Sequence, residues 1–395
     1  AMNREFAPVC PKDYPLENPE TLPTPRPLFF FDKLEANRNT LLRETGGPDN
    51  LRLMAKTVKS PDLLRMYVDA GVTRFKASSV AEAEKAVIPA GAKDILISYP
   101  LLGPYISNYL DLCERFPEVR LSTLVPNREC ADALSNEAQK HSHGADVFLD
   151  IDPYMHRTGV GFGEALYRLA ETVQFLPGLR IVGLHAYDGH IHHDNPYALD
   201  LYAENLLRQL DQAVSELEKR GIRVEEVVTS SSITFAAASA AYQRRFPAYR
   251  WKHTVSPGTC VLWDSNHNDL QPGHFEYAMA VAARVVDVID RDGEQIITTD
   301  AGVKMGLSPD IGPVHVTAFE GYAAFGGSER HGTFVWLGHD RATWKPLDSS
   351  LRKSVGDVVL LFPRHVCTTL NQYDYGYMVR NGRIAEKISI AGRDG

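Results

Sequence analysis

The stretch Leu51-Arg52-Leu53-Met54-Ala55-Lys56-Thr57-Val58-Lys59-Ser60-Pro61 places two lysines at the end of an apolar run, directly before the start of a helix. Apolar residues alternate through its first half and turn signals lie on both sides, which predicts a short buried strand. Ser60 suits an N-cap, and Pro61 suits the first position of the helix that follows. The stretch therefore predicts a strand, a turn and a helix, with Lys56 at the carboxyl end of the strand.

A lysine in this place has two interpretations. In barrel enzymes of α/β type, the chemistry is kept at the carboxyl ends of the strands. An amine that is desolvated there can lose its proton near neutral pH and attack a carbonyl group. The alternative is that Lys56 and Lys59 are two loop lysines in water.

The alternation of strands and helices continues along the chain to about residue 256. Strands are predicted near residues 51–55, 73–76, 94–98, 119–125, 145–151, 179–186, 224–229 and 253–256. Eight strands within about 200 residues are the number and length of a (β/α)8 TIM-type barrel. An open, doubly wound sheet is the rival fold.

After about residue 270 the pattern changes to alternating apolar residues and hairpin turns, which predicts a mostly β C-terminal domain. We therefore expect three parts. Residues 1–31 form a proline-rich strap and a strand (28–31) that packs on the β domain, residues 32–265 form the barrel, and residues 266–395 form the β domain.

The composition excludes several classes of function. A formal charge of -8 and the absence of a basic run argue against a nucleic-acid partner. The five cysteines are scattered without a Cys-x-x-Cys pair, which predicts no disulfide framework and favours a reducing cytoplasm. No apolar run has the length needed to span a bilayer, so no membrane partner is expected.

Two of the predicted strand ends carry reactive side chains. The fifth leads to Arg157 beside a glycine loop, where its guanidinium can reach an anionic oxygen or lie at the surface. The sixth leads into His185–His193, a density of titratable and aromatic groups that a plain connection does not need. Solvated loop histidines are the alternative.

The seventh and eighth strands end in the hydroxyl-rich segments Thr229–Thr234 and Ser256–Cys260. These are the two loops where a (β/α)8 barrel most often binds phosphate, although a run of hydroxyls can also cap a helix. A lysine at one strand end and a phosphate cradle at two others describe pyridoxal phosphate bound as a Schiff base.

In the β domain, His365 and Cys367 follow Pro363 on a strand-like run. Residues two apart on a strand point to the same side, so an imidazole nitrogen and a thiolate would converge on one ion. Two ligands are half of a zinc site, and a buried cysteine beside a capping histidine is the alternative.

With these segments in place, the chain resembles the D-threonine aldolase and D-serine dehydratase group of fold-type III pyridoxal phosphate enzymes, which are relatives of alanine racemase. The likeness covers nearly the whole chain. It rests on the order of the segments Lys56–Pro61, Phe75–Glu84, Arg157–Val160, Gly183–His190 and His365–Cys367.

The resemblance implies that Lys56 carries the internal aldimine, that Arg157 contacts the phenolic oxygen of the cofactor and that Tyr187 packs beside the ring. It implies a phosphate held at Ser231, Ser232, Thr234, Gly258 and Thr259. It also places a divalent metal on His365 and Cys367, where a thiolate favours zinc over magnesium or manganese. Next to the aldimine, that metal can act as a Lewis acid on the substrate's 3-hydroxyl.

This chain departs from the family near the lysine. The family commonly has Pro-His before the lysine and His two residues after it, whereas this chain has Leu53, Met54 and Val58, and Ile233 stands where the family tends to have Gly. Lys56, Tyr187 and His190 are the expected catalytic residues. The proton-transfer role is open among His190, His192, His193 and a metal-bound water.

These observations predict a metal-assisted pyridoxal phosphate lyase that cleaves a D-3-hydroxy amino acid to glycine and an aldehyde. Dehydration of D-serine or 3-hydroxyaspartate to a keto acid and ammonia is the alternative reaction, towards which Cys367 tilts. A non-catalytic pyridoxal phosphate carrier is the alternative of another class. A homodimer is a further expectation from the family.

Overall fold

The computed structural model describes residues 11–245, 248–291, 294–305, 316–317, 321–339 and 344–393. The first ten residues of the predicted strap, with Cys10, and the predicted turn residues Asp292 and Gly293 lie outside these ranges. The chain divides into two compact units, one formed by residues 40–258 with 394–395 and the other by residues 1–39 with 259–393.

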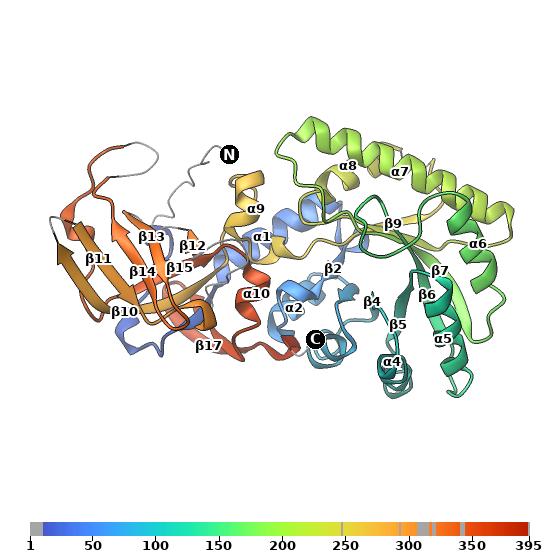
Figure 1. The fold of residues 1–395 in the computed structure, drawn as a ribbon, viewed down its shortest axis with the longest axis horizontal. Helices are drawn as coiled ribbons and strands as arrows, with labels where there is room; N and C mark the ends of the chain where they lie inside the picture. The colour runs from blue at the N-terminus through green and yellow to red at the C-terminus, as the bar shows by residue number, and fades with distance from the viewer. Residues whose placement is uncertain are drawn as a thin grey trace. The chain divides into compact units, whose positions relative to one another are not determined.

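The larger unit is a barrel of eight parallel strands in sequence order, which confirms the predicted fold (Figure 1). The isolated parallel bridge between Leu51 and Val255 joins the last strand to the first. The strands are β2 (Arg52–Met54), β3 (Arg74–Ala77), β4 (Asp94–Pro100), β5 (Arg120–Val125), β6 (Ala145–Ile151), β7 (Leu179–Ala186), β8 (Glu226–Thr229) and β9 (Lys252–Val255).

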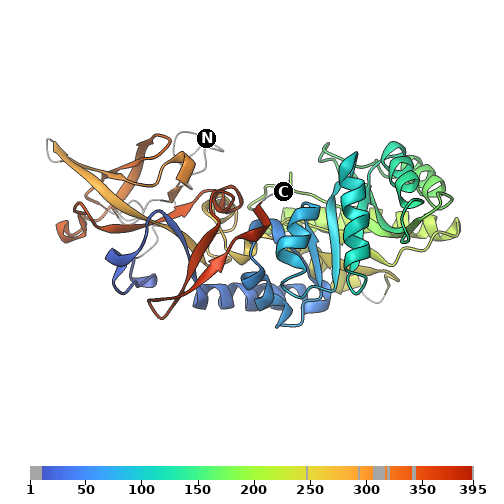
Figure 2. The same ribbon diagram turned by 90° about the horizontal axis from the view of Figure 1, so that it is seen from below.

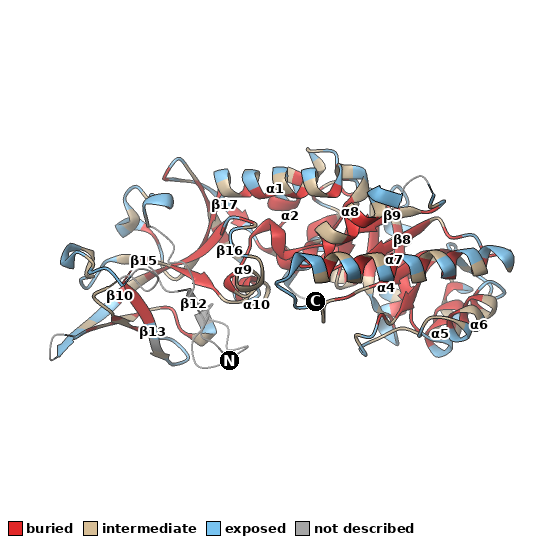
Figure 3. Cartoon of the chain, turned by 90° about the horizontal axis from the view of Figure 1, so that it is seen from above, coloured by how far each residue is buried: buried red, intermediate tan, exposed pale blue. Residues whose placement is uncertain are grey.

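Helices connect these strands, and their apolar faces lie against the barrel. They are α2 (Pro61–Val68), α3 (Val80–Glu82) continued by the turn η5 (Ala83–Val87), α4 (Pro104–Arg115), α5 (Arg128–Ala138), α6 (Glu164–Val173), α7 (Pro196–Lys219) and α8 (Phe235–Arg245). In Figure 3 the strands are buried and the helices expose one side, as amphipathic helices on a barrel do. Predicted caps form: the Ser60 hydroxyl accepts a hydrogen bond from the backbone N–H of Leu63 and the Ser79 hydroxyl from that of Glu82.

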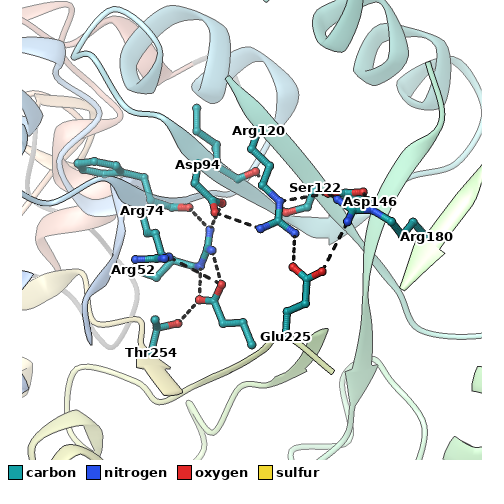
Figure 4. Close-up of polar contacts among 12 residues, drawn as sticks. Arg52, Arg74, Asp94, Arg120, Ser122, Asp146, Arg180, Glu225 and Thr254 are labelled. Carbon is teal, nitrogen blue, oxygen red and sulfur yellow. Dashed lines mark hydrogen bonds and ion pairs between the residues drawn. The ribbon is translucent and has the colours of Figure 1, made fainter. Parts of the chain in front are cut away.

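Side chains fill the barrel interior in layers. At the amino ends of the strands lies a layer of paired charges, in which Arg52 bonds Glu226 and Asp94 (Figure 4). Above it lies an apolar layer made of Leu96, Leu124, Phe148, Val182 and Val228. Residues two apart on a strand share a face, so the next layer towards the carboxyl ends begins at Lys76 and Asp150.

The other unit is built on an antiparallel sheet that includes the first strand of the chain. β1 lies between β10, with which it pairs antiparallel, and β16, with which it pairs parallel (Figure 2). The strands are β1 (Arg26–Phe30), β10 (Met279–Arg291), β11 (Glu294–Thr299), β12 (Val316–Thr317), β13 (Tyr322–Gly327), β14 (Gly332–Trp336), β15 (Val358–Pro363), β16 (Tyr375–Arg380) and β17 (Arg383–Ser389). The helices are α9 (Ser265–Leu270) and α10 (Val366–Leu370), and α1 (Phe31–Thr45) begins in this unit.

Candidate active site

Lys56 lies directly beyond the end of β2, as the sequence predicts. It is the middle residue of the single helical turn η4 (Ala55–Thr57), and its neighbours Ala55 and Thr57 are buried while Lys56 itself is exposed. The two buried neighbours anchor the turn. The amine of Lys56 is therefore presented at the carboxyl ends of the barrel strands, where a carbonyl compound can reach it.

Lys59 is not a loop lysine in water, and that interpretation is wrong. Lys59 is only 7% exposed, and its Nζ donates a hydrogen bond to the backbone carbonyl of Lys56 over 2.7 Å. Its backbone has φ 54, in the left-handed region that a lysine seldom adopts. The buried Glu82 carboxylate lies close enough to interact with it electrostatically. Lys59 thus clamps the turn that carries Lys56.

Arg157 and Tyr187 come together above the barrel interior. The guanidinium carbon of Arg157 lies 4.7 Å from the centre of the Tyr187 ring, a cation–π contact. Gly189 is needed beside this ring because a Cβ there would overlap the Tyr187 side chain. The two residues expected at the phenolic oxygen and the ring of the cofactor are therefore in contact, in the part of the barrel that follows β6 and β7.

A buried lysine that the predicted site did not include lies beneath these residues. Lys76, on β3, is 4% exposed, and its Nζ lies 5.2 Å from the centre of the Tyr187 ring and 3.4 Å from Nε2 of His185. Burial, together with the charges of Lys56 and Arg157, lowers the pKa of Lys76 to about 7. The segment Phe75–Glu84 pointed to this strand, but nothing in its letters says that Lys76 faces inward.

His185 joins Lys76 to a buried carboxylate. Its Nδ1 lies 2.7 Å from Oδ1 of Asp150, so Nδ1–H donates to Asp150 and the lone pair of Nε2 accepts from the amine of Lys76. Burial lowers the pKa of His185, which favours this neutral form. The other carboxylate oxygen of Asp150 is buried and has no hydrogen-bond partner among the residues described.

The loops after β8 and β9 form one connected structure. The Thr234 hydroxyl accepts from the backbone N–H of Ser231 over 2.9 Å and donates to the carboxylate of Asp188 over 2.8 Å. The Ser232 hydroxyl accepts from the backbone N–H of Gly258 over 3.1 Å. Burial raises the pKa of Asp188 to about 6. Asp188, inside the predicted segment His185–His193, therefore holds the Thr234 loop.

These loops fit a phosphate group. The loop after β8 precedes the amino end of α8, where backbone N–H groups and the helix dipole favour an anion. The Ser256 hydroxyl is buried and has no partner in the described part of the chain. A Cβ on Gly258 would lie 2.9 Å from Oγ1 of Thr57 and 3.0 Å from the backbone oxygen of Met54, so only glycine leaves this space open. Thr259, which follows directly, is also buried and starts the turn η6 (Thr259–Val261).

The three candidate histidines differ in their surroundings. His190 is half-buried, burial lowers its pKa, and its Nδ1 is buried without a hydrogen-bond partner within the described ranges. His192 and His193 are exposed. Only His190 therefore has the enclosed environment that a proton-transfer group needs.

The predicted strand geometry of the metal pair is wrong. β15 ends at Pro363, His365 is the N-cap residue of α10 and Cys367 lies inside this helix. His365 has an extended backbone (φ -136, ψ 99), whereas Cys367 lies in the helix, so the strand argument for their convergence does not apply. Within the ranges that the structure describes, one group of three metal-ligand side chains comes together, Asp111, Glu114 and His141, and it lies at the surface.

The comparisons with known proteins agree with this fold. Residues 31–263 match the model of the alanine racemase N-terminal domain. The chain belongs to this family. Residues 278–379 match the model of a putative serine dehydratase domain. The resemblance drawn from the sequence is thus confirmed.

Relatives with assigned activities are lyases. The chain is 25% identical to 3-hydroxy-D-aspartate aldolase of Paracoccus denitrificans, over 94% of this chain and 92% of the relative. It is 25% identical to D-threo-3-hydroxyaspartate dehydratase of Delftia sp. strain HT23, over 89% and 93%. The crystal structure of D-threonine aldolase from Filomicrobium marinum superposes with a TM-score of 0.80 at 26% identity, covering 100% of this chain and 99% of that one. The expectation that the chain is an enzyme of the lyase class is confirmed, and both an aldolase and a dehydratase agree with these matches.

The structure also bears on the expectations about membrane spans and disulfide bonds. In the described part of the chain, no helix combines the length and the apolar character that a membrane crossing requires. Cys113, Cys130, Cys260 and Cys367, the cysteines within the described ranges, form no disulfide.

Proposed function

We propose that this protein is a pyridoxal phosphate-dependent lyase that cleaves a D-3-hydroxy amino acid to glycine and an aldehyde. The observation that carries the proposal is the placement of an exposed lysine amine, at Lys56, on the same strand ends as an anion-binding loop pair and the Arg157–Tyr187 contact. The relatives at 25% identity support the choice of a D-3-hydroxy amino acid.

Each residue has a part in binding. The Lys56 amine would attach the aldehyde group of the cofactor. Arg157 would face its phenolic oxygen, Tyr187 would pack against its ring, and the N–H groups and hydroxyls before α8 would hold its phosphate. When bound, pyridoxal phosphate supplies an electron sink for the electron pair released at the substrate's Cα. The clamp by Lys59 keeps the Lys56 turn in place while substrate and product exchange.

His365 and Cys367 would hold a divalent metal, for which zinc is our proposal because an imidazole and a thiolate are donors that zinc prefers. The metal would supply Lewis acidity towards the 3-hydroxyl of the substrate. Chelation by EDTA is expected to abolish cleavage, and added zinc is expected to restore it. Activity that survives complete removal of the metal would exclude the metal from the mechanism.

The cofactor is tested by absorbance. Purified protein mixed with pyridoxal phosphate is expected to turn yellow and to show the aldimine band, and Lys56→Ala is expected to lose both the band and the activity. Lys93→Ala is the matched control, since Lys93 is an exposed lysine just before the amino end of β4. A wild-type chain that stays colourless would refute the proposal. A coloured chain without turnover on a panel of D-amino acids would instead indicate the non-catalytic carrier.

Dehydration is the second candidate, because one relative at 25% identity is a D-threo-3-hydroxyaspartate dehydratase. The two reactions give different products. Glycine with an aldehyde indicates the aldolase, whereas a keto acid with ammonia indicates the dehydratase. Measuring both product pairs on D-threonine, D-serine and 3-hydroxy-D-aspartate decides between them.

A homodimer and a cytoplasmic location stay predictions from the sequence and the resemblance. Light scattering of the purified chain measures its mass directly, and a mass of one chain at micromolar concentration would contradict the dimer.

A further inference from the structure

Lys76 is an ionisable group in the barrel that the proposed function does not use. It lies on β3 directly beside Met54 of β2 and Leu96 of β4, one layer above the apolar interior. A buried lysine costs free energy unless its charge is paired or absent. Its amine lies against the neutral imidazole of His185 and the face of Tyr187, and among the residues that the structure describes no carboxylate is hydrogen-bonded to it.

The surroundings of Lys76 oppose a permanent positive charge. Groups from five elements face its amine: Lys56 from η4, Asp150 from β6, His185 from β7, Arg157 from the loop after β6, and Tyr187 and Asp188 from the loop after β7. Two of these are cations. Burial and these two cations together outweigh the more distant carboxylates and lower the pKa of Lys76 to about 7. Above that pH the amine is neutral and carries a lone pair.

The hydrogen bond to His185 orients this amine. One N–H of Lys76 is directed to Nε2 of His185, which Asp150 in turn holds in place. The other side of the nitrogen faces the Tyr187 ring, against which Arg157 also packs. The second N–H and the lone pair are therefore left on the side of the residues expected to contact the cofactor.

We propose that Lys76 is a proton-transferring residue of this site, which takes the proton of the substrate's 3-hydroxyl at its Nζ and returns it to Cα. This inference rests on the proposed function. It assigns the role that a histidine near Lys56 cannot fill here, because Met54 and Val58 have no titratable group. It also assigns the role to a group better enclosed than His190, which is half-buried, and than His192 and His193, which are exposed.

The transfer balances without another reactant. The O–H bond of the 3-hydroxyl breaks and its proton forms a new N–H bond on neutral Lys76. The electron pair of the O–H bond becomes the second bond of the aldehyde as the Cα–Cβ bond breaks. The electron pair of that broken bond stays on Cα, where it takes the proton back from the Lys76 ammonium. Glycine and aldehyde leave, and Lys76 is neutral again.

The first test needs no turnover. In the full chain labelled with 13C-lysine, before pyridoxal phosphate is added, the Cε signal of each lysine is followed from about pH 5 to about pH 10. The Lys76 signal is the one missing in Lys76→Arg. We expect it to titrate near pH 7, well below the other lysines. A Lys76 midpoint above about pH 9 would overturn the inference, whatever the reaction proves to be.

The second test uses kinetics. Lys76→Met and Lys76→Arg are both expected to lower kcat by roughly 100-fold or more, because a positioned base contributes about that much. Both variants should keep the aldimine absorbance, since Lys56 and the phosphate loops are intact. The wild-type rate should rise with pH up to about 7, the pKa at which Lys76 becomes neutral, and this rise should be absent in both variants. Lys93→Met is the control for a lost lysine and should match the wild type.

Arginine separates charge from proton transfer, because its guanidinium keeps a positive charge but does not give up a proton in this range. A Lys76→Arg enzyme within about threefold of the wild type would show a purely electrostatic role and refute the inference. A wild-type chain that binds the cofactor but forms no glycine and aldehyde would refute the proposed reaction instead. The two failures are therefore distinguishable.

Discussion

The charge layer at the amino ends of the barrel strands makes a strong prediction about stability. Arg52 is fully buried, and its guanidinium donates to Glu226 over 3.0 and 2.7 Å and to Asp94 over 2.8 Å. Glu226, the carboxylate that accepts two of these hydrogen bonds, is 6% exposed. Replacing Arg52 by methionine would leave the buried Glu226 carboxylate with the Thr254 hydroxyl as its donor and with a longer ion pair to Arg74, whose Nε lies 4.0 Å from Oε2.

The magnitude follows from these contacts. Three charge-assisted hydrogen bonds are each worth roughly 1.5–3 kcal/mol, and removal of the buried guanidinium regains part of that as relieved desolvation. We expect Arg52→Met to lower the free energy of unfolding of the barrel by about 3–5 kcal/mol, the range found when one partner of a buried ion pair is removed. Adding Glu226→Gln to Arg52→Met should recover part of the loss, since the unpaired charge is then gone.

Arg180 is the matched control, since it also pairs with a carboxylate of this layer, Asp146, but its side chain is 60% exposed (Figure 4). Arg180→Met should cost about 0–1 kcal/mol, as for other surface ion pairs. Urea unfolding combined with hydrogen exchange in β2 and β8 measures the barrel separately from the other unit. A loss below about 1 kcal/mol in Arg52→Met, or a double variant no more stable than the single one, would refute this account.

Three further predictions concern the site. Lys59→Met should lower cofactor uptake and kcat by about tenfold, measured by aldimine absorbance and product formation, because the clamp on the Lys56 carbonyl is lost while the strained φ of 54 must still be held. Gly258→Ala should weaken cofactor binding by about tenfold or more in a spectral titration, because its Cβ would stand 2.9 Å from Oγ1 of Thr57. Gly161→Ala is the control and should not weaken binding, since a Cβ there meets nothing within 4 Å. Asp188 has its pKa raised from 3.8 to about 6, so the folded state holds this proton longer than the unfolded state and stability falls as pH rises between these values. Asp188→Asn should reduce this loss of stability by about 2–3 kcal/mol, measured as the change in the free energy of unfolding between about pH 4 and pH 7 in each protein. The same change in wild type and variant would contradict the prediction.

Local patterns in the sequence were enough to predict the barrel. The apolar alternation of Leu51–Ala55, the N-cap Ser60 and the first-turn proline Pro61 each describe a few adjacent residues, and β2, η4 and α2 follow them. Because strands and helices alternate through eight strands, the sequence determined both the strand order and the strand end on which Lys56 lies. It also placed the hydroxyl loops after the last two strands.

The amino-acid sequence alone was not enough to predict the geometry of a segment that changes from strand to helix. His365 and Cys367 follow an apolar strand, and their side chains suit a strand or a helix start equally well. The cap position of His365 depends on how β15 and α10 pack, including the hydrogen bond from the backbone N–H of Val366 to Asp264, which is about a hundred residues earlier.

Burial of the two additional lysines was decided only by the tertiary structure. Lys59 and Lys76 read as ordinary polar residues, because side-chain environment is a property of neighbours that are distant in sequence. Lys76 meets His185, and through it Asp150, from strands β7 and β6. The sequence by itself therefore determined the scaffold and Lys56, whereas the closure of the barrel decided which other amines lose contact with water and can change their pKa.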